Sequence, residues 1–124
     1  MKLIIQIPCF NEEKTLLQVI SDLPREISGI DKIEIQVIDD GSTDDTVRIA
    51  KELKIDHIIR LGRNKGLASA FKAGINNALM LNADFLVNTD GDNQYQGNDI
   101  VKLVMAAISE KADLVVGCRP IKNH

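Results

Sequence analysis

Two carboxylates that stand one residue apart are the part of this sequence best suited to chemistry. Asp90 and Asp92 flank Gly91, which leaves the backbone free to bend. Two carboxylates about 5 Å apart repel each other by roughly 3 kcal/mol at an effective dielectric near 20, unless a cation lies between them. Mg²⁺ or Mn²⁺ accepts such ligands and takes its remaining ones from water and phosphate oxygens. The triplet therefore predicts either a divalent metal site that holds a diphosphate or a solvated acidic turn.

A second acidic cluster, Asp39-Asp40-Gly41-Ser42, follows an apolar run. Gly41 and Ser42 are typical of a turn into a helix, where nearby acids interact favourably with the helix dipole. A carboxylate at such a strand end can also accept hydrogen bonds from a base or a ribose. These two roles are compatible, and we expect the cluster to contact a ligand.

Other polar segments exclude some kinds of site. The segment 8–13 contains no glycine, so the dinucleotide fingerprint is absent there, and no Walker A sequence occurs. Cys9 is expected to be a small buried filler, because neither histidine stands beside it in the sequence. A basic group around two glycines could bind an anion, although a solvated loop is the simpler interpretation; its members are Arg60, Arg63 and Lys65.

The strands and helices that position these clusters are predicted from short apolar runs, which alternate with segments whose apolar residues recur at helical spacing. The predicted strands are 3–7, 33–38, 57–61, 85–87 and 114–116, and the predicted helices are 12–24, 44–53, 67–79 and 98–108. Ser42 or Thr43 is expected to cap the second helix, and Asn98 the fourth. This alternation predicts a mostly parallel sheet with helices on both faces. The polar clusters then meet at the carboxyl ends of the strands, where such sheets bind ligands.

The composition fits one globular domain that spans residues 1–124. Hydrophobic residues make up 44% and charged residues 27% of the chain, which is typical of a folded protein. A net charge of −3 and 3% aromatic residues argue against nucleic-acid binding. Two cysteines are too few for a disulfide scaffold, and no apolar run is long enough to cross a membrane. We therefore expect a cytoplasmic protein.

Four motifs follow one another along the chain. They are Pro8-Cys9-Phe10-Asn11-Glu12-Glu13, Ile38-Asp39-Asp40-Gly41-Ser42-Thr43-Asp44-Asp45-Thr46, Asn64-Lys65-Gly66 followed by Ala70, and Asp90-Gly91-Asp92-Asn93-Gln94. Together they resemble the nucleotide-binding half of family 2 glycosyltransferases with the GT-A fold. The chain is most similar to the subgroup of dolichyl-phosphate mannose synthase and polyprenyl-phosphate sugar transferases, which the ending 113–119 also resembles.

This resemblance implies a Rossmann-like, three-layer α/β/α fold and an inverting transfer of a sugar from a UDP- or GDP-linked donor. Asp40 is expected to contact the base or ribose, and Phe10 stands where members often have tyrosine. The nucleotide-binding residues implied are Pro8, Phe10, Glu12, Asp40, Asp90 and Gln94, and the ligands implied for Mg²⁺ or Mn²⁺ are Asp90 and Asp92.

Members of that family continue well past the fifth strand, whereas this chain ends at His124. We therefore expect a truncated donor-binding fragment, with the catalytic base and the acceptor-binding part beyond residue 124. A polyprenyl phosphate acceptor, and association with the cytoplasmic face of a membrane, would belong to that further part.

Other classes of protein fit the sequence less well. A response-regulator receiver would need an aspartate at the end of the third strand, where Leu61-Gly62 stands. A sugar-nucleotide nucleotidyltransferase shares the metal chemistry but should have a glycine-rich triphosphate loop in place of 8–13. A non-catalytic nucleotide-binding module is the other alternative.

Overall fold

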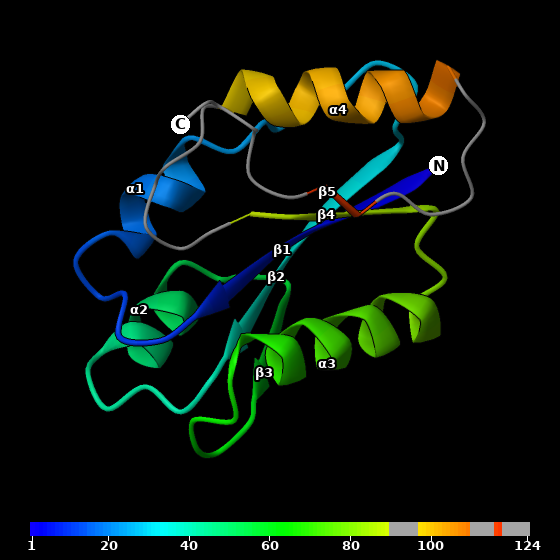
Figure 1. Ribbon diagram of the computed structural model, residues 1–124. Helices are drawn as coiled ribbons and strands as arrows, with labels where there is room; N and C mark the ends of the chain where they lie inside the picture. Colours follow the sequence, from blue (N-terminus) through cyan, green and yellow to red (C-terminus); the bar gives the residue numbers. More distant parts are fainter. Residues whose placement is uncertain (90–96, 110–115, 118–124) are drawn as a thin grey trace, which may run out of the picture.

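The computed structural model describes residues 1–89, 97–109 and 116–117, and side chains within 97–99 and 116–117 are not described. Strands and helices alternate along the chain (Figure 1). The strands are β1 (Lys2–Cys9), β2 (Lys32–Asp39), β3 (His57–Arg60), β4 (Phe85–Asn88) and β5 (Val116–Gly117). The helices are α1 (Leu16–Ser21), α2 (Thr46–Glu52), α3 (Leu67–Met80) and α4 (Gly97–Ser109).

The strands form one parallel sheet in the order β3-β2-β1-β4-β5. β1 lies in the middle, and its residues from Leu3 to Cys9 are all buried. It pairs with β2 from Lys2↔Lys32 to Cys9↔Asp39, so the two strands end at the same level. The strand order reverses between β1 and β4, and parallel sheets bind ligands beyond the carboxyl ends at such a point.

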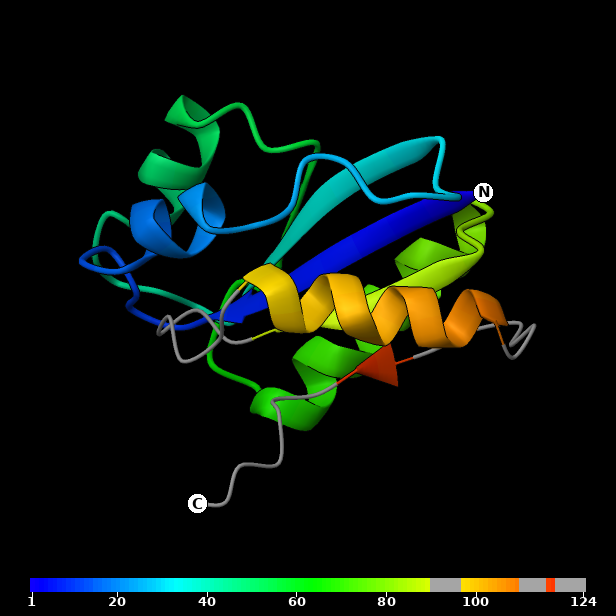
Figure 2. The ribbon, with the colours of Figure 1, turned by 90° about the horizontal axis from the view of Figure 1, so that it is seen from above.

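Helices cover both faces of the sheet, which confirms the predicted three-layer α/β fold. The larger apolar core joins α1, α2 and α4 to one face, through residues such as Leu16, Ala50 and Val104. On the other face α3 contacts β1 and β2. Figure 2, seen from above, shows α4 in front of the sheet and α3 behind it. The buried residues of α3, Ala70, Gly74 and Ala78, are small and four apart, so the helix can approach the sheet closely.

Local predictions at helix ends were less accurate. The first helix begins at Leu16 and ends at Ser21, inside the predicted range 12–24. The N-cap of α2 is Asp45, and neither Ser42 nor Thr43 caps it, because both bind Asn11 across the sheet edge. The fourth helix begins at Gly97, so Asn98 lies within it. Residues 114–115 of the predicted fifth strand lie outside the described residues, and β5 overlaps that prediction at Val116.

None of the helices in the described part of the chain is both long enough and apolar enough to cross a membrane.

Candidate functional site

Three loops that leave the carboxyl ends of neighbouring strands are tied together by polar groups. We call them the rim: residues 10–15, 40–45 and 61–66, which follow β1, β2 and β3. Asn11 links the first two loops. Its Oδ1 accepts the backbone N–H groups of Thr43 at 2.8 Å and Asp44 at 3.3 Å, and its own N–H donates to Ser42 Oγ at 2.9 Å. Asn11 has a φ of 53°, a left-handed conformation that asparagine adopts more readily than most residues.

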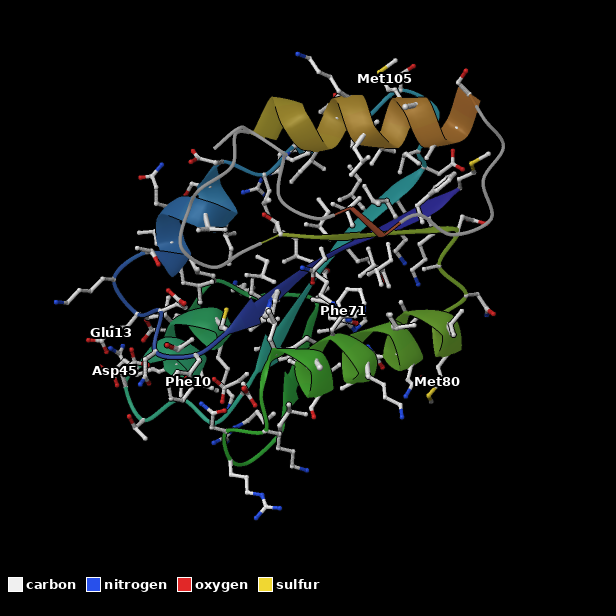
Figure 3. The ribbon with its side chains drawn as sticks, viewed as in Figure 1. Phe10, Glu13, Asp45, Phe71, Met80 and Met105 are labelled. Atoms are coloured by element: carbon white, nitrogen blue, oxygen red, sulfur yellow. The ribbon has the colours of Figure 1, made fainter. Side chains whose placement is uncertain are left out.

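The two residues after Asn11 bind the start of α2. Thr46 is fully buried, and its Oγ1 accepts the N–H of Glu12 at 2.8 Å. The N–H of Asp45 donates to Glu13 Oε1 at 2.8 Å, and Figure 3 shows these two side chains at the same end of the molecule as Phe10. The loop after β1 is therefore fixed by residues of the next βα unit.

Two carboxylates of the rim are used to hold this loop arrangement. Burial opposes ionisation of Asp44, but hydrogen bonds from the Thr46 hydroxyl and from backbone N–H groups outweigh it and hold the pKa of Asp44 below its usual value. Arg48 lies 2.9 Å from Asp45 and lowers the pKa of that carboxyl. Both groups are therefore charged at neutral pH. Asp44 connects Glu13 of the first loop to the start of α2, and Asp45 pairs with Arg48 of α2.

Asp40 connects the second loop to the third. Its Oδ1 accepts the N–H of Lys65 at 2.7 Å and its Oδ2 accepts the N–H of Gly66 at 3.0 Å. Gly41 allows this contact, because a Cβ there would lie 2.4 Å from the backbone of Arg63. Asp40 is almost fully buried in this arrangement, and each of its carboxylate oxygens keeps a second acceptor site. Its predicted ligand contact stays a prediction.

The predicted residues of the first motif all lie at this end of the sheet, with different exposure. Pro8 is buried within β1 and pairs in register with Ile38. Phe10 is 42% exposed and Glu12 is partly buried. The exposed ring of Phe10 offers a face on which a base could stack.

Cys9 is a buried filler, as predicted. Its thiol is almost inaccessible and donates to the backbone oxygen of Ile7 at 3.6 Å. Burial raises the pKa of the thiol, and the nearby carboxylates of Glu12, Asp39 and Asp44 raise it further. The group is therefore uncharged at neutral pH and unsuited to nucleophilic attack.

The basic residues near the third loop are exposed: Arg60, Arg63 and Lys65. Within the described part of the chain their side chains form no ion pair, so their charges remain available to an anion. This exposure fits the solvated loop that the sequence favours and leaves an anion-binding role as the alternative.

Asp90, Asp92 and Gln94 lie outside the described residues. The chain can be followed to Thr89, whose N–H donates to the backbone oxygen of Gln6 at 2.8 Å, so β4 ends beside β1. Among the residues that the structure describes, no three acidic, histidine or cysteine side chains are grouped to hold a metal ion. The predicted metal ligands remain Asp90 and Asp92, whose two carboxylates suit Mg²⁺ or Mn²⁺.

Sequence reasoning gave no role to several residues that build the rim. Asn11 and Thr46 fell within recognised motifs, but their partners lie about thirty positions away along the chain. The sequence pattern around each residue does not indicate which distant residue it will hydrogen-bond.

Comparison with known proteins completes this description. The model of glycosyl transferase family 2 matches residues 4–124. The chain belongs to this family. An uncharacterised protein of Methanocaldococcus jannaschii is 39% identical over 123 residues, which cover 94% of this chain and 52% of that protein. The UDP-N-acetylglucosamine–dolichyl-phosphate N-acetylglucosaminyltransferase of Methanococcus voltae is 35% identical, over 94% of this chain and 51% of the relative.

A solved structure of a similar protein supports the fold. TarS residues 1–349 of S. aureus, crystallised with UDP-GlcNAc, superposes with a TM-score of 0.67 at 24% identity. The match covers 89% of this chain and 32% of that TarS 1–349 chain. The family 2 chain described here spans about half the length of the two sequence relatives named above.

Proposed function

We propose that this chain binds the nucleoside diphosphate of a sugar donor and is the donor-binding part of a family 2 glycosyltransferase. The main support for this proposal is the rim, in which hydrogen bonds to Asn11 and Asp40 hold three strand-end loops together. Such bracing fixes the backbone before a ligand arrives, so little ordering cost is left for binding. Membership of the family and the donor named for TarS support this choice of ligand.

Within this proposal the rim binds the nucleoside and the end of β4 binds the diphosphate. Phe10 contacts the base, Asp40 accepts a hydrogen bond from the base or ribose, and Pro8 and Glu12 complete the pocket. Asp90, Asp92 and Gln94 follow β4 in the sequence, and the two aspartates would hold Mg²⁺ or Mn²⁺. When bound, such an ion neutralises charge that develops on the departing diphosphate.

The reaction proposed for the whole protein is an inverting sugar transfer. An acceptor oxygen attacks the anomeric carbon from the side opposite the nucleoside diphosphate, which leaves with the electrons of the broken bond. A polyprenyl phosphate is a suitable acceptor because it is already an anion. The name of the Methanococcus voltae relative includes a dolichyl phosphate. We assign no catalytic base among the described residues.

Thermal unfolding of the chain with UDP, GDP, ADP and CDP, with and without Mn²⁺, tests the proposal. A ligand at a hundred times its dissociation constant adds about 2.7 kcal/mol, which shifts the midpoint by several degrees at this size. We expect a metal-dependent shift with one of the diphosphates. The absence of any shift in a chain that unfolds cooperatively would reject donor binding.

Matched variants test the metal ligands. Asp92→Asn should remove the part of the shift that depends on Mn²⁺. Asp22→Asn makes the same charge change at an exposed position at the end of α1 and should leave the shift intact. Equal effects of the two substitutions would reject the metal assignment.

A further inference from the structure

A row of side-chain amides crosses the sheet beneath α3. Gln6 of β1 and Gln36 of β2 are fully buried, which is unusual for glutamine. Gln36 Nε2 donates to Gln6 Oε1 at 2.9 Å, and Gln6 Nε2 donates to Asn88 Oδ1 at 3.0 Å. The row therefore connects β2, β1 and β4 at right angles to the strands. Buried amides are costly unless they are hydrogen-bonded, so this row is a built feature of the fold.

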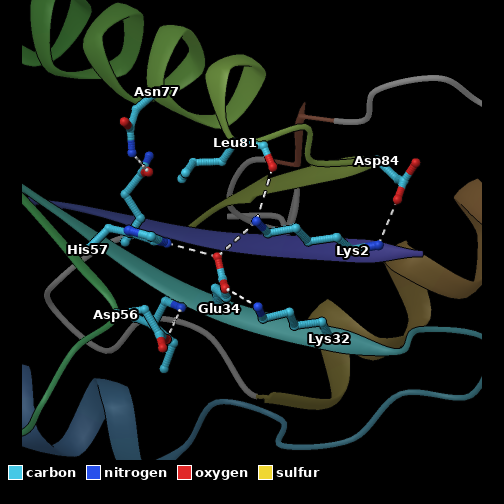
Figure 4. Close-up of polar contacts among 10 residues, drawn as sticks. Lys2, Lys32, Glu34, Asp56, His57, Asn77, Leu81 and Asp84 are labelled. Atoms are coloured by element: carbon cyan, nitrogen blue, oxygen red, sulfur yellow. Dashed lines mark hydrogen bonds and ion pairs between the residues drawn. The ribbon is translucent and has the colours of Figure 1, made fainter.

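The direction of these hydrogen bonds is fixed from the α3 side. The backbone oxygen of Gly74 can only accept, and Gln36 Nε2 donates to it at 3.1 Å. Gln36 Oε1 accepts from Asn77 Nδ2 at 2.6 Å, and Figure 4 shows Asn77 reaching from α3 toward the sheet. These two contacts determine which end of the Gln36 amide faces which partner. Gln36 in turn fixes the orientation of Gln6.

Gly74 is required by the same arrangement. A Cβ at this position would lie 1.6 Å from Gln6 Oε1, so the amide occupies the space that a side chain would fill. A glycine in the interior of a 14-residue helix costs helix stability relative to alanine. Its presence here is explained by the close approach of α3 to the amide row.

The row ends at Asn88, the last residue of β4. Because Gln6 occupies Asn88 Oδ1, the two N–H donors of Asn88 Nδ2 are left over, and among the described residues no acceptor binds them. Asn88 is partly exposed, pairs in register with Gln6 and precedes Asp90 by two positions in the sequence. Asn88 is level with Gln6 and is the last residue of β4, beside the point where the strand order reverses.

We propose that Asn88 donates a hydrogen bond to the diphosphate of the bound nucleotide. Gln6 is then a positioning residue, which orients the Asn88 nitrogen toward that diphosphate. This inference rests on the proposed function. A neutral N–H donor favours an anionic oxygen, whereas a carboxamide turned the other way would present its oxygen and repel the ligand. The amide row selects the favourable orientation before the ligand binds.

The substitution Asn88→Asp tests the inference while it preserves shape. One carboxylate oxygen can still accept from Gln6, and the other replaces the N–H donors. NMR titration with Mg²⁺ present would compare the diphosphate that the unaltered chain prefers with the corresponding nucleoside. We expect affinity for the diphosphate to fall by about tenfold or more and affinity for the nucleoside to stay unchanged. Asn76→Asp is the control, because it adds the same charge on the exposed side of α3 and should change neither affinity.

A second variant tests the positioning role. Gln6→Met keeps a similar volume and removes the amide, so Asn88 loses its fixed orientation. We expect a smaller loss of diphosphate affinity, again without loss of nucleoside affinity. If this variant fails to fold, the result for Asn88→Asp still decides the main inference.

The outcomes are distinguishable from a failure of the proposed function. Equal or tighter diphosphate binding by Asn88→Asp, or equal losses for diphosphate and nucleoside, would overturn the inference alone. If the unaltered chain binds neither compound, the proposed function fails and the role of Asn88 falls with it.

Discussion

At the scale of single residues, the rim depends on side chains that substitute for backbone partners. Asn11 accepts two backbone N–H groups from the loop after β2, and Thr46 accepts one from the loop after β1. Loops of this kind carry many N–H groups that no regular structure can satisfy. Bracing by short polar side chains allows the loops to be ordered at the sheet edge without a covering helix.

Thr46 gives the sharpest test of this bracing. Thr46→Val keeps the volume of a fully buried side chain but leaves the N–H of Glu12 without its acceptor. We expect the free energy of unfolding to fall by about 1–3 kcal/mol, because the part-buried N–H of Glu12 loses its acceptor and Asp44 loses the hydrogen bond from the Thr46 hydroxyl. Urea unfolding would measure the change, and affinity for the nucleotide should fall with it. Thr46→Ser, which keeps the hydroxyl and removes the methyl group, should lose much less, and a loss as large as that of Thr46→Val would contradict the role given to the hydroxyl.

At the scale of elements, the amino ends of β1, β2 and β3 are joined by a charged cluster. Glu34 of β2 is almost fully buried and lies 2.8 Å from His57 Nε2, 3.1 Å from Lys32 Nζ and 3.2 Å from Lys2 Nζ. Figure 4 shows these side chains converging on one carboxylate. The cluster lies at the edge of the sheet opposite the rim, so its role is in stability.

The pKa of Glu34 predicts how stability depends on pH. Burial opposes ionisation, but hydrogen bonds from His57, Lys32 and Lys2 outweigh it and lower the pKa of Glu34 to about 2 from its usual 4.5. Between these two values the unfolded chain binds the proton more tightly than the folded chain. Stability from this group is therefore complete above about pH 4.5 and is lost as the pH falls toward 2.

Urea unfolding between pH 2 and 6 would measure this effect. We expect Glu34 to account for roughly 2 to 3 kcal/mol of the acid-dependent loss. Glu34→Gln should be less stable at neutral pH and should show a flatter pH profile in this range. Glu26→Gln, at an exposed position with no ion pair in the described part of the chain, should leave the profile unchanged. Parallel profiles for the unaltered chain and Glu34→Gln would contradict the assignment.

Elements also show where sequence reasoning succeeds. The helix at Leu67–Met80 and the strand at Phe85–Asn88 were predicted nearly to the residue. Both were predicted from the spacing of apolar residues and the run of strand-forming residues, which are visible within a short stretch of sequence. The first helix was predicted to start at Glu12, whereas α1 begins at Leu16, whose N–H donates to the Glu12 carbonyl, and the N–H groups of Glu12 and Glu13 donate to Thr46 and Asp44. The buried amides Gln6 and Gln36 could not be predicted, since polar residues within a strand carry no sign of their partners.

At the scale of the whole molecule, the two edges of the sheet differ in how they are built. At the carboxyl edge, hydrogen bonds join the loops after β1, β2 and β3 into one unit. At the amino edge, most residues of 25–31 line an open hollow together with Ile33. Asp31 contacts Met1, the residue before β1. Ligand binding at the rim should therefore reduce the local opening of all three rim loops and leave that of residues 25–31 unchanged.

Hydrogen exchange measured with and without the preferred nucleoside diphosphate tests this cooperative behaviour. Asp40 accepts the N–H groups of Lys65 and Gly66, and Asn11, which follows Phe10, accepts that of Thr43. A ligand that holds Phe10 and Asp40 should therefore also slow exchange in the loop 61–66, which it does not touch. We expect protection in 10–15, 40–45 and 61–66 together, with residues 25–31 unchanged as an internal control. Protection confined to one loop would show that the loops respond independently. Equal protection of the rim loops and of residues 25–31 would indicate a general rise in stability, because a ligand bound at the rim should slow exchange more in the rim loops than in 25–31.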